Sequence, residues 1–76
     1  MRSVQRELNQ RIGRTLRKFR GSDTQRLAAK KLNVTHTFLS AIENGRVTTS
    51  LELIATALEK YGFSLDAFIE EVRKDD

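Results

Sequence analysis

The sequence contains no cysteine and no proline, and it has only four glycines and one histidine among its 76 residues. Without cysteine the chain has no disulfide, no zinc–thiolate site and no thiol nucleophile, and a single histidine argues against a metal site. No run of about 18 apolar residues occurs, so we expect no membrane span. The first residues lack the apolar stretch of a signal peptide. We therefore expect a cytoplasmic protein.

Catalytic motifs are also missing. The chain has no glycine-rich phosphate loop and no pair of carboxylates at a plausible cleft. A single small domain spanning residues 1–76 offers little room for a substrate pocket. We predict that the protein is not an enzyme and that it needs no cofactor. The lack of proline and the scarcity of glycine favour helices.

Positive charge is in excess and unevenly distributed. The net charge is +4 and the isoelectric point is about 10. Residues 1–38 carry ten basic and two acidic side chains, a net charge of +8, whereas residues 39–76 carry four basic and eight acidic ones, a net charge of −4. This asymmetry indicates either a polyanionic partner facing the first half or a set of solvated helix faces.

Hydrophobic periodicity predicts five helices, each preceded by a serine or threonine of the kind that caps helix N-termini. The predicted caps are Ser3, Thr24, Thr35, Ser50 and Ser64. The predicted helices, with the cap counted in the second and third, span residues 4–20, 24–32, 35–44, 51–61 and 65–73. Gly45 and Gly62 are expected to end the third and fourth helices in the left-handed conformation, and Asn33 tolerates a sharp turn before the third.

Apolar stripes predict the buried faces of the first and fourth helices. In the first helix the stripe consists of Val4, Leu8, Ile12, Leu16 and Phe19, and in the fourth it consists of Leu51, Ile54, Ala55, Leu58 and Tyr61. Gly13 interrupts the first helix at a cost of about 1 kcal/mol relative to alanine. A close contact with another helix would explain a glycine there.

The segment TQRLAAKKLNVTHTFLSAIENG, residues 24–45, has the spacing of two short helices joined by a turn of about three residues. The small side chain of Ala29 lets the two helices cross closely. Four apolar residues are expected to hold the crossing angle: Leu32, Val34, Leu39 and Ile42. A fixed angle lets the second helix project into the major groove of DNA, which is about 12 Å wide.

This segment and its flanks resemble the phage-repressor and Cro-type, or Xre-like, helix-turn-helix family. The resemblance rests on the segment itself and on four further stretches, LRKFRG (16–21), IENG (42–45), SLELIATAL (50–58) and GFSLDAFI (62–69). Together they cover the chain from about Leu8 to Ile69. The resemblance implies an all-α fold, a five-helix lambda-repressor-like DNA-binding domain.

The chain departs from the family pattern at several positions. Asn33 stands where the family often has glycine, and Thr49 stands where proline is frequent. Ser22 and Asp23 lengthen the loop before the motif, and they replace one apolar anchor residue. Leu27 occupies a position that is normally polar, and we expect it to compensate for the lost anchor by packing toward Phe19.

The resemblance also assigns roles to side chains. The start of the third helix faces base edges or nearby phosphates through Thr35, His36, Thr37 and Ser40. Gln25 is expected to contact a phosphate and to brace the recognition helix, and Thr24, Asn44 and Arg46 are expected to contact the DNA backbone. Phe38 is either partly packed or an exposed contact to a thymine methyl group. Short polar side chains at a helix N-terminus suit both contacts.

One such domain presents a single recognition helix. At roughly 1–3 kcal/mol for each good base contact, one helix is too little to select a site in a genome. We therefore predict a homodimer on a partly palindromic site, with two recognition helices about 34 Å apart. The fifth helix carries apolar residues that form either its core face or the dimer surface: Leu65, Phe68, Ile69 and Val72.

The main prediction is a sequence-specific regulator of transcription that binds double-stranded DNA and acts as a repressor. One alternative is an antitoxin that regulates its own promoter and also binds a toxin protein. Another is a helical protein-interaction module that no longer binds DNA. The antitoxin predicts a co-purifying protein partner, and the interaction module predicts no affinity for DNA.

Overall fold

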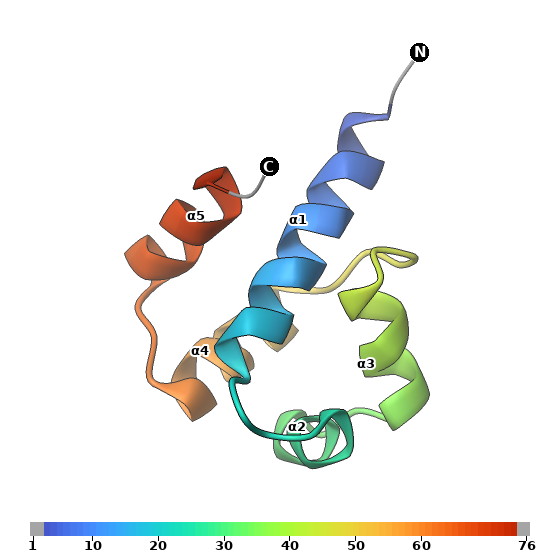
Figure 1. The fold of residues 1–76 in the computed structure, drawn as a ribbon, viewed down its shortest axis with the longest axis vertical. Coiled ribbons are helices and arrows are strands. Elements are labelled where there is room, and N and C mark those ends of the chain that lie inside the picture. Colours follow the sequence, from blue (N-terminus) through green and yellow to red (C-terminus); the bar gives the residue numbers. More distant parts are fainter. Residues whose placement is uncertain (1–2, 75–76) are drawn as a thin grey trace.

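The computed structural model describes residues 3–74, which form five helices and no strand. The helices are α1 (Val4–Phe19), α2 (Gln25–Leu32), α3 (His36–Glu43), α4 (Leu51–Tyr61) and α5 (Leu65–Lys74). Figure 1 shows α1 running through the middle of the molecule, with α2 and α3 against one end and one side of it and α5 along the opposite side. The all-α prediction is confirmed. Within residues 3–74 no helix combines the length and hydropathy needed to cross a bilayer.

Each helix begins at its predicted cap. In all five, the hydroxyl of the cap residue accepts a hydrogen bond from the backbone N–H three residues later, at 3.0–3.2 Å. The caps are Ser3, Thr24, Thr35, Ser50 and Ser64. A cap of this kind satisfies an N–H that has no partner within the helix, and it contributes about 1 kcal/mol.

Three helices end in a left-handed residue, as predicted. Asn33, Gly45 and Gly62 have φ values of 59°, 71° and 72°. The next N–H then donates to the carbonyl five residues earlier, in the bonds from Val34 to Ala29, from Arg46 to Ala41 and from Phe63 to Leu58. This is the Schellman arrangement, in which a sharp turn satisfies the last carbonyls of a helix.

All five helices contribute to one core, but α1 does so only through its second half. Leu16 and Phe19 are buried and Ile12 packs against the core, whereas the side chains of Val4 and Leu8 are 77% and 45% exposed. The predicted buried stripe of α1 is therefore wrong for its first two turns. The reason is visible in Figure 1, where these turns extend past the helices that cover the rest of α1.

The buried face of α4 also differs from the predicted one. Leu53, Ile54 and Ala57 are buried, while Leu51 is 85% exposed and Ala55 is exposed as well. Apolar residues lie on several faces of α4, so the periodicity allows more than one stripe. The packing of α4 against α2 decides which of them faces the core.

Gly13 marks the closest approach between two helices. A Cβ atom at this position would overlap the carbonyl oxygen of Ile42 and would lie 2.9 Å from that of Glu43. The backbone of α1 therefore rests directly on the last turn of α3. This confirms the expected close contact, and it fixes the position of α3 against the long helix.

The loop between α1 and α2 is held by polar contacts. The carboxylate of Asp23 accepts hydrogen bonds from the Lys31 ammonium group at 2.7 Å and from the Tyr61 hydroxyl at 2.9 Å. The bond from Lys31, followed by that from Tyr61, lowers the pKa of the Asp23 carboxyl. Burial and the hydrogen bond to Asp23 raise the pKa of Tyr61 to about 12. The polar residue in the lengthened loop is thus itself an anchor.

Phe63 supplies the apolar contact that was expected from Leu27. The rings of Phe19 and Phe63 are stacked with their centroids 3.8 Å apart, and Phe68 meets Phe19 edge to face at 6.1 Å. Leu27 is exposed. The expectation that it compensates for the lost anchor is wrong, because the segment between α4 and α5 brings another aromatic ring to Phe19.

Candidate nucleic-acid interface

The helices α2 and α3 form a helix-turn-helix held by small and apolar side chains. Ala28 and Ala29 are almost completely buried, and so are Leu39 and Ile42 on α3. Leu32 is buried beside them, and Val34 in the turn packs against the core. The small side chains of Ala28 and Ala29 let the two helices approach closely, as predicted for Ala29.

The first turn of α3 is exposed and polar. Thr35, His36 and Thr37 are exposed, Ser40 is half-buried one turn later, and Phe38 is exposed as well. The hydroxyl of Thr35 is engaged with the N–H of Phe38 at 3.0 Å. These residues form one end of a short helix whose other face is buried, so they are presented on a rigid support.

Gln25 connects the start of α2 to both ends of α3. Its Nε2 donates to Oε1 of Glu43 at 2.9 Å, and its Oε1 lies 2.7 Å from Nε2 of His36. The expected bracing of the recognition helix is confirmed. Because an amide oxygen only accepts hydrogen bonds, Nε2 of His36 must carry the proton in this contact. In the neutral ring Nδ1 is then an acceptor.

An ion pair between Arg20 and Glu43, which was not predicted from the sequence, holds the acceptor of Gln25 in place. The guanidinium of Arg20 donates to both carboxylate oxygens of Glu43, at 2.7 and 3.0 Å, and also to the carbonyl of Asp23 at 2.8 Å. The Glu43 side chain is only 3% exposed. The hydrogen bond to Glu43 raises the pKa of Arg20. A carboxylate four residues after the buried Leu39 was the available signal, since a charge on a buried face needs a partner.

Arg20, Glu43, Gln25 and His36 thus form one connected network. It runs from the end of α1, through the end of α3 and the start of α2, to the exposed start of α3. A side chain held by such a chain of contacts has few alternative positions. His36 is therefore connected, through Gln25 and Glu43, to the residue that follows α1.

The basic first half of the chain pairs in part with the acidic second half. Lys18 contacts Glu71 at 2.7 Å, and Arg11 donates to the last carbonyls of α5 at 3.1 and 3.3 Å. Arg20 also pairs with Glu43 of the second half, whereas Lys31 pairs with Asp23 within the first half. The charge asymmetry is therefore partly internal. Within residues 3–74, the basic side chains that are exposed and make no contact of this kind include Arg6, Arg17, Arg26, Lys30 and Arg46.

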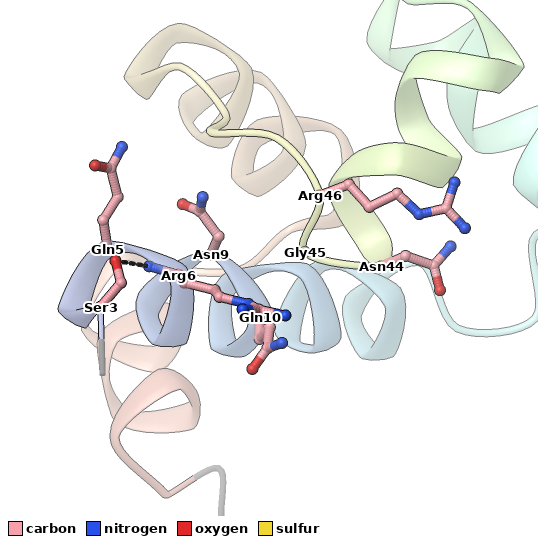
Figure 2. A pocket seen from close by; sticks show the side chains of 8 residues that line it. All are labelled: Ser3, Gln5, Arg6, Asn9, Gln10, Asn44, Gly45 and Arg46. Atoms are coloured by element: carbon pink, nitrogen blue, oxygen red, sulfur yellow. Dashed lines mark hydrogen bonds between the residues drawn. The ribbon is translucent and has the colours of Figure 1, made fainter. Parts of the chain in front are cut away.

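The segment after α3 carries the other predicted DNA contacts. Arg46 is exposed, and the amide of Asn44 donates to the carbonyl of Ser40 at 2.8 Å. Thr24 is exposed as the cap of α2. Their contacts with a DNA backbone stay predictions. Figure 2 shows Arg46 and Asn44 beside a groove that continues along the start of α1. No sequence motif indicates this groove.

The apolar residues of α5 divide between core and surface. Phe68 is 5% exposed and lies in the core, and Val72 packs against the core from its edge. Leu65 and Ile69 are 60% and 48% exposed. Leu65 also lines an apolar groove of about 410 Å³ with Leu51, Ile54, Ala55, Leu58, Glu59 and Phe63. Phe68 is therefore not available to a second copy of the chain.

Comparison with known proteins places this geometry among helix-turn-helix proteins. A family model described as a helix-turn-helix domain matches residues 11–69. Two crystal structures of the clp gene regulator ClgR from Corynebacterium glutamicum are similar, at 32% sequence identity and TM-scores of 0.81 and 0.80. Each match covers 87% of this chain, and the two cover 72% and 87% of the ClgR chains. No curated protein sequence matches the chain.

Proposed function

The chain belongs to the helix-turn-helix domain family, and on that basis we propose that it is a transcriptional regulator that binds double-stranded DNA. In this proposal α3 enters the major groove, and the segments around it contact the backbone on either side. The similar ClgR structures are those of a gene regulator. A regulator of this kind acts where the DNA is, so the predicted cytoplasmic location is part of the proposal.

The contact between Gln25 and His36 is the observation that carries the proposal. It holds an imidazole at the exposed start of α3, with Nδ1 of the neutral ring as an acceptor. In the major groove the exocyclic amino groups of adenine and cytosine are donors. We therefore propose that His36 reads one of these bases. Thr37 and Ser40 would read neighbouring base edges, and Thr35 would approach the groove as well.

The finer proposal is a homodimer that represses transcription from a partly palindromic operator. The limited number of base contacts from one α3 supports a dimer, since a second copy doubles them. Leu65 and Ile69 supply exposed apolar surface for it, and Leu65 also lines the apolar groove described above. Repression is the simplest action because it requires only that the bound protein occupy a promoter.

Selection of bound sequences from a random pool of duplex DNA tests this function. We expect an enriched site with dyad symmetry. His36→Ala or Thr37→Ala should relax the preference at individual positions. Arg46→Ala should weaken binding to all sequences alike and should reduce the slope of log K against log salt by about 0.9 for each protomer.

Three outcomes would contradict the proposal or a part of it. If no sequence is enriched and the salt slope is near zero, the protein is better explained as a helical interaction module that does not bind DNA. Stable capture of a toxin protein, with DNA binding confined to the chain's own promoter, would favour the antitoxin. Sedimentation of the chain as a monomer at binding concentrations, together with a selected site that lacks a dyad, would refute the dimer.

A further inference from the structure

The first two turns of α1 form a surface that the family match does not include. The family model begins at residue 11, whereas α1 begins at Val4. These turns leave the core, and they run alongside the segment that follows α3 (Figures 1 and 2). Between them lies an open groove of about 460 Å³, lined by Ser3, Gln5, Arg6, Asn9, Gln10, Asn44, Gly45 and Arg46.

The groove is polar and positively charged. Arg6 and Arg46 line it from its two sides, and among residues 3–74 no acidic side chain lines it. Glu7, the acidic residue of α1, lies 3.6 Å from Arg11 on the next turn. The remaining polar lining consists of amide and hydroxyl side chains. Such a surface suits an anion whose oxygens accept several hydrogen bonds.

The groove is also held in a defined shape. Gly45 fits so closely against α1 that a Cβ atom there would lie 2.6 Å from Cγ and 2.9 Å from Cα of Gln10. The amide groups of Gln5 and Asn9 both donate to the hydroxyl of Thr48, at 2.9 and 3.2 Å. The segment that carries Arg46 is therefore held against the start of α1 by the close packing of Gly45 and by the hydrogen bonds to Thr48.

We propose that this groove binds the phosphate backbone of the DNA that flanks the major groove entered by α3. Arg6 would contact a phosphate beyond the one contacted by Arg46, so the start of α1 would lengthen the DNA site. The inference rests on the proposed function. It adds a residue and a backbone position that the helix-turn-helix alone does not provide. Because phosphates carry no sequence information, the contact raises affinity and leaves base preference unchanged.

Arg6→Ala tests the proposal, with Lys60→Ala as a control that removes one exposed positive charge from α4. The probe is a duplex with the selected site and at least one further turn of DNA on each side. We expect Arg6→Ala to lower the salt slope by about 0.9 for each bound protomer. Hydroxyl-radical footprinting should show loss of protection at the outermost backbone positions only. Arg6→Lys should keep most of the slope, since it keeps the charge.

The outcomes separate this inference from the proposed function. If the wild-type protein binds and Arg6→Ala leaves slope and footprint unchanged, the groove does not contact DNA, while the proposed function stands. If Lys60→Ala lowers the slope as much as Arg6→Ala does, the effect is one of net charge, and the proposal is wrong. If the wild-type protein binds no duplex, the proposed function itself fails. Equal melting temperatures of the variants exclude an effect through folding.

Discussion

Gly13 lies in the middle of α1, where helix propensity alone would favour alanine by about 1 kcal/mol. We predict the opposite result for Gly13→Ala, because the new methyl group would meet two backbone carbonyls of α3 that cannot move aside. The net loss should be about 2 kcal/mol or more. For a domain of this size, that lowers the melting temperature by roughly 10 °C. Thermal unfolding followed by circular dichroism measures it.

Gly21→Ala is the matched control. Gly21 has a φ of 57°, and no heavy atom would lie within 4 Å of its added Cβ. Only backbone strain opposes the substitution, at about 1 kcal/mol. A Gly13→Ala protein more stable than both the control and the wild type would show that α1 and α3 are not in backbone contact.

Tyr61 provides a second prediction at the residue scale, because it is the single tyrosine in a chain without tryptophan. Its near-ultraviolet absorbance should report ionisation with a midpoint near pH 12 in the folded protein and near 10 in denaturant. A raised pKa means that the neutral hydroxyl is favoured by folding. Its contribution to stability is therefore complete below pH 10 and is lost as the pH rises from 10 to 12.

Asp23→Asn tests the physical cause of that shift. Burial is its largest cause and the hydrogen bond to Asp23 the next, so the midpoint should move only part of the way back toward 10. On the acid side the sign is reversed. The lowered pKa of Asp23 stabilises the fold above the carboxyl's ordinary value of 3.8, and this contribution is lost as the pH falls through the lower folded value. If Asp23→Asn left the Tyr61 midpoint at the wild-type value, that result would contradict the hydrogen bond between Tyr61 and Asp23.

At the scale of the helices, Glu43 of α3 joins three elements. Its carboxylate accepts hydrogen bonds from Arg20, which follows α1, and from Gln25 of α2. Glu43→Gln preserves the shape of the side chain but leaves the guanidinium of Arg20 buried without its counter-charge. We expect the free energy of unfolding to fall by about 3 kcal/mol in urea denaturation. The preference for the base read by His36 should also weaken, because one of the two acceptor oxygens that Arg20 and Gln25 share becomes an amide donor.

Two further variants separate stability from positioning. Glu59→Gln removes an exposed carboxylate on α4, and it should change neither stability nor base preference. Replacing Arg20 by methionine together with Glu43 by leucine should recover much of the stability, because an apolar pair of similar volume needs no compensation. It should not recover the base preference. Recovery of both would mean that the network stabilises the fold without orienting His36.

At the scale of the whole molecule, the remaining exposed apolar surface bears on the proposed dimer. Phe68 cannot test that interface, because a charge there would disrupt the core. Ile69→Asp changes an exposed side chain on the same helix. We expect it to give monomers in sedimentation experiments, with weak and unspecific DNA binding. Val4→Asp, the same type of change on an exposed apolar residue of α1, should leave the oligomeric state unchanged. Dimers that persist in Ile69→Asp would move the interface elsewhere.

The positions of the helices followed from the sequence because they depend on neighbours within a few residues. The hydroxyl caps act on an N–H three residues later. The left-handed turns at Asn33, Gly45 and Gly62 let the next N–H donate to a carbonyl five residues before it. The turn between α2 and α3 is part of this local set. For the same reason the exposed start of α3 could be proposed as the reading surface from spacing and family resemblance alone.

The tertiary structure decided what depends on residues far apart in the chain. Ten basic side chains stand in the first half, and nothing local indicates that Arg20 pairs with Glu43 while Arg6 lines a groove with Arg46. Nor does periodicity determine which apolar stripe of α4 is buried, or that Phe68 lies inside while Ile69 lies outside. A stripe of apolar residues shows that one face of a helix is apolar, but that face is buried only where another helix packs against it. The first two turns of α1 extend past the neighbouring helices, so the apolar residues Val4 and Leu8 stay exposed.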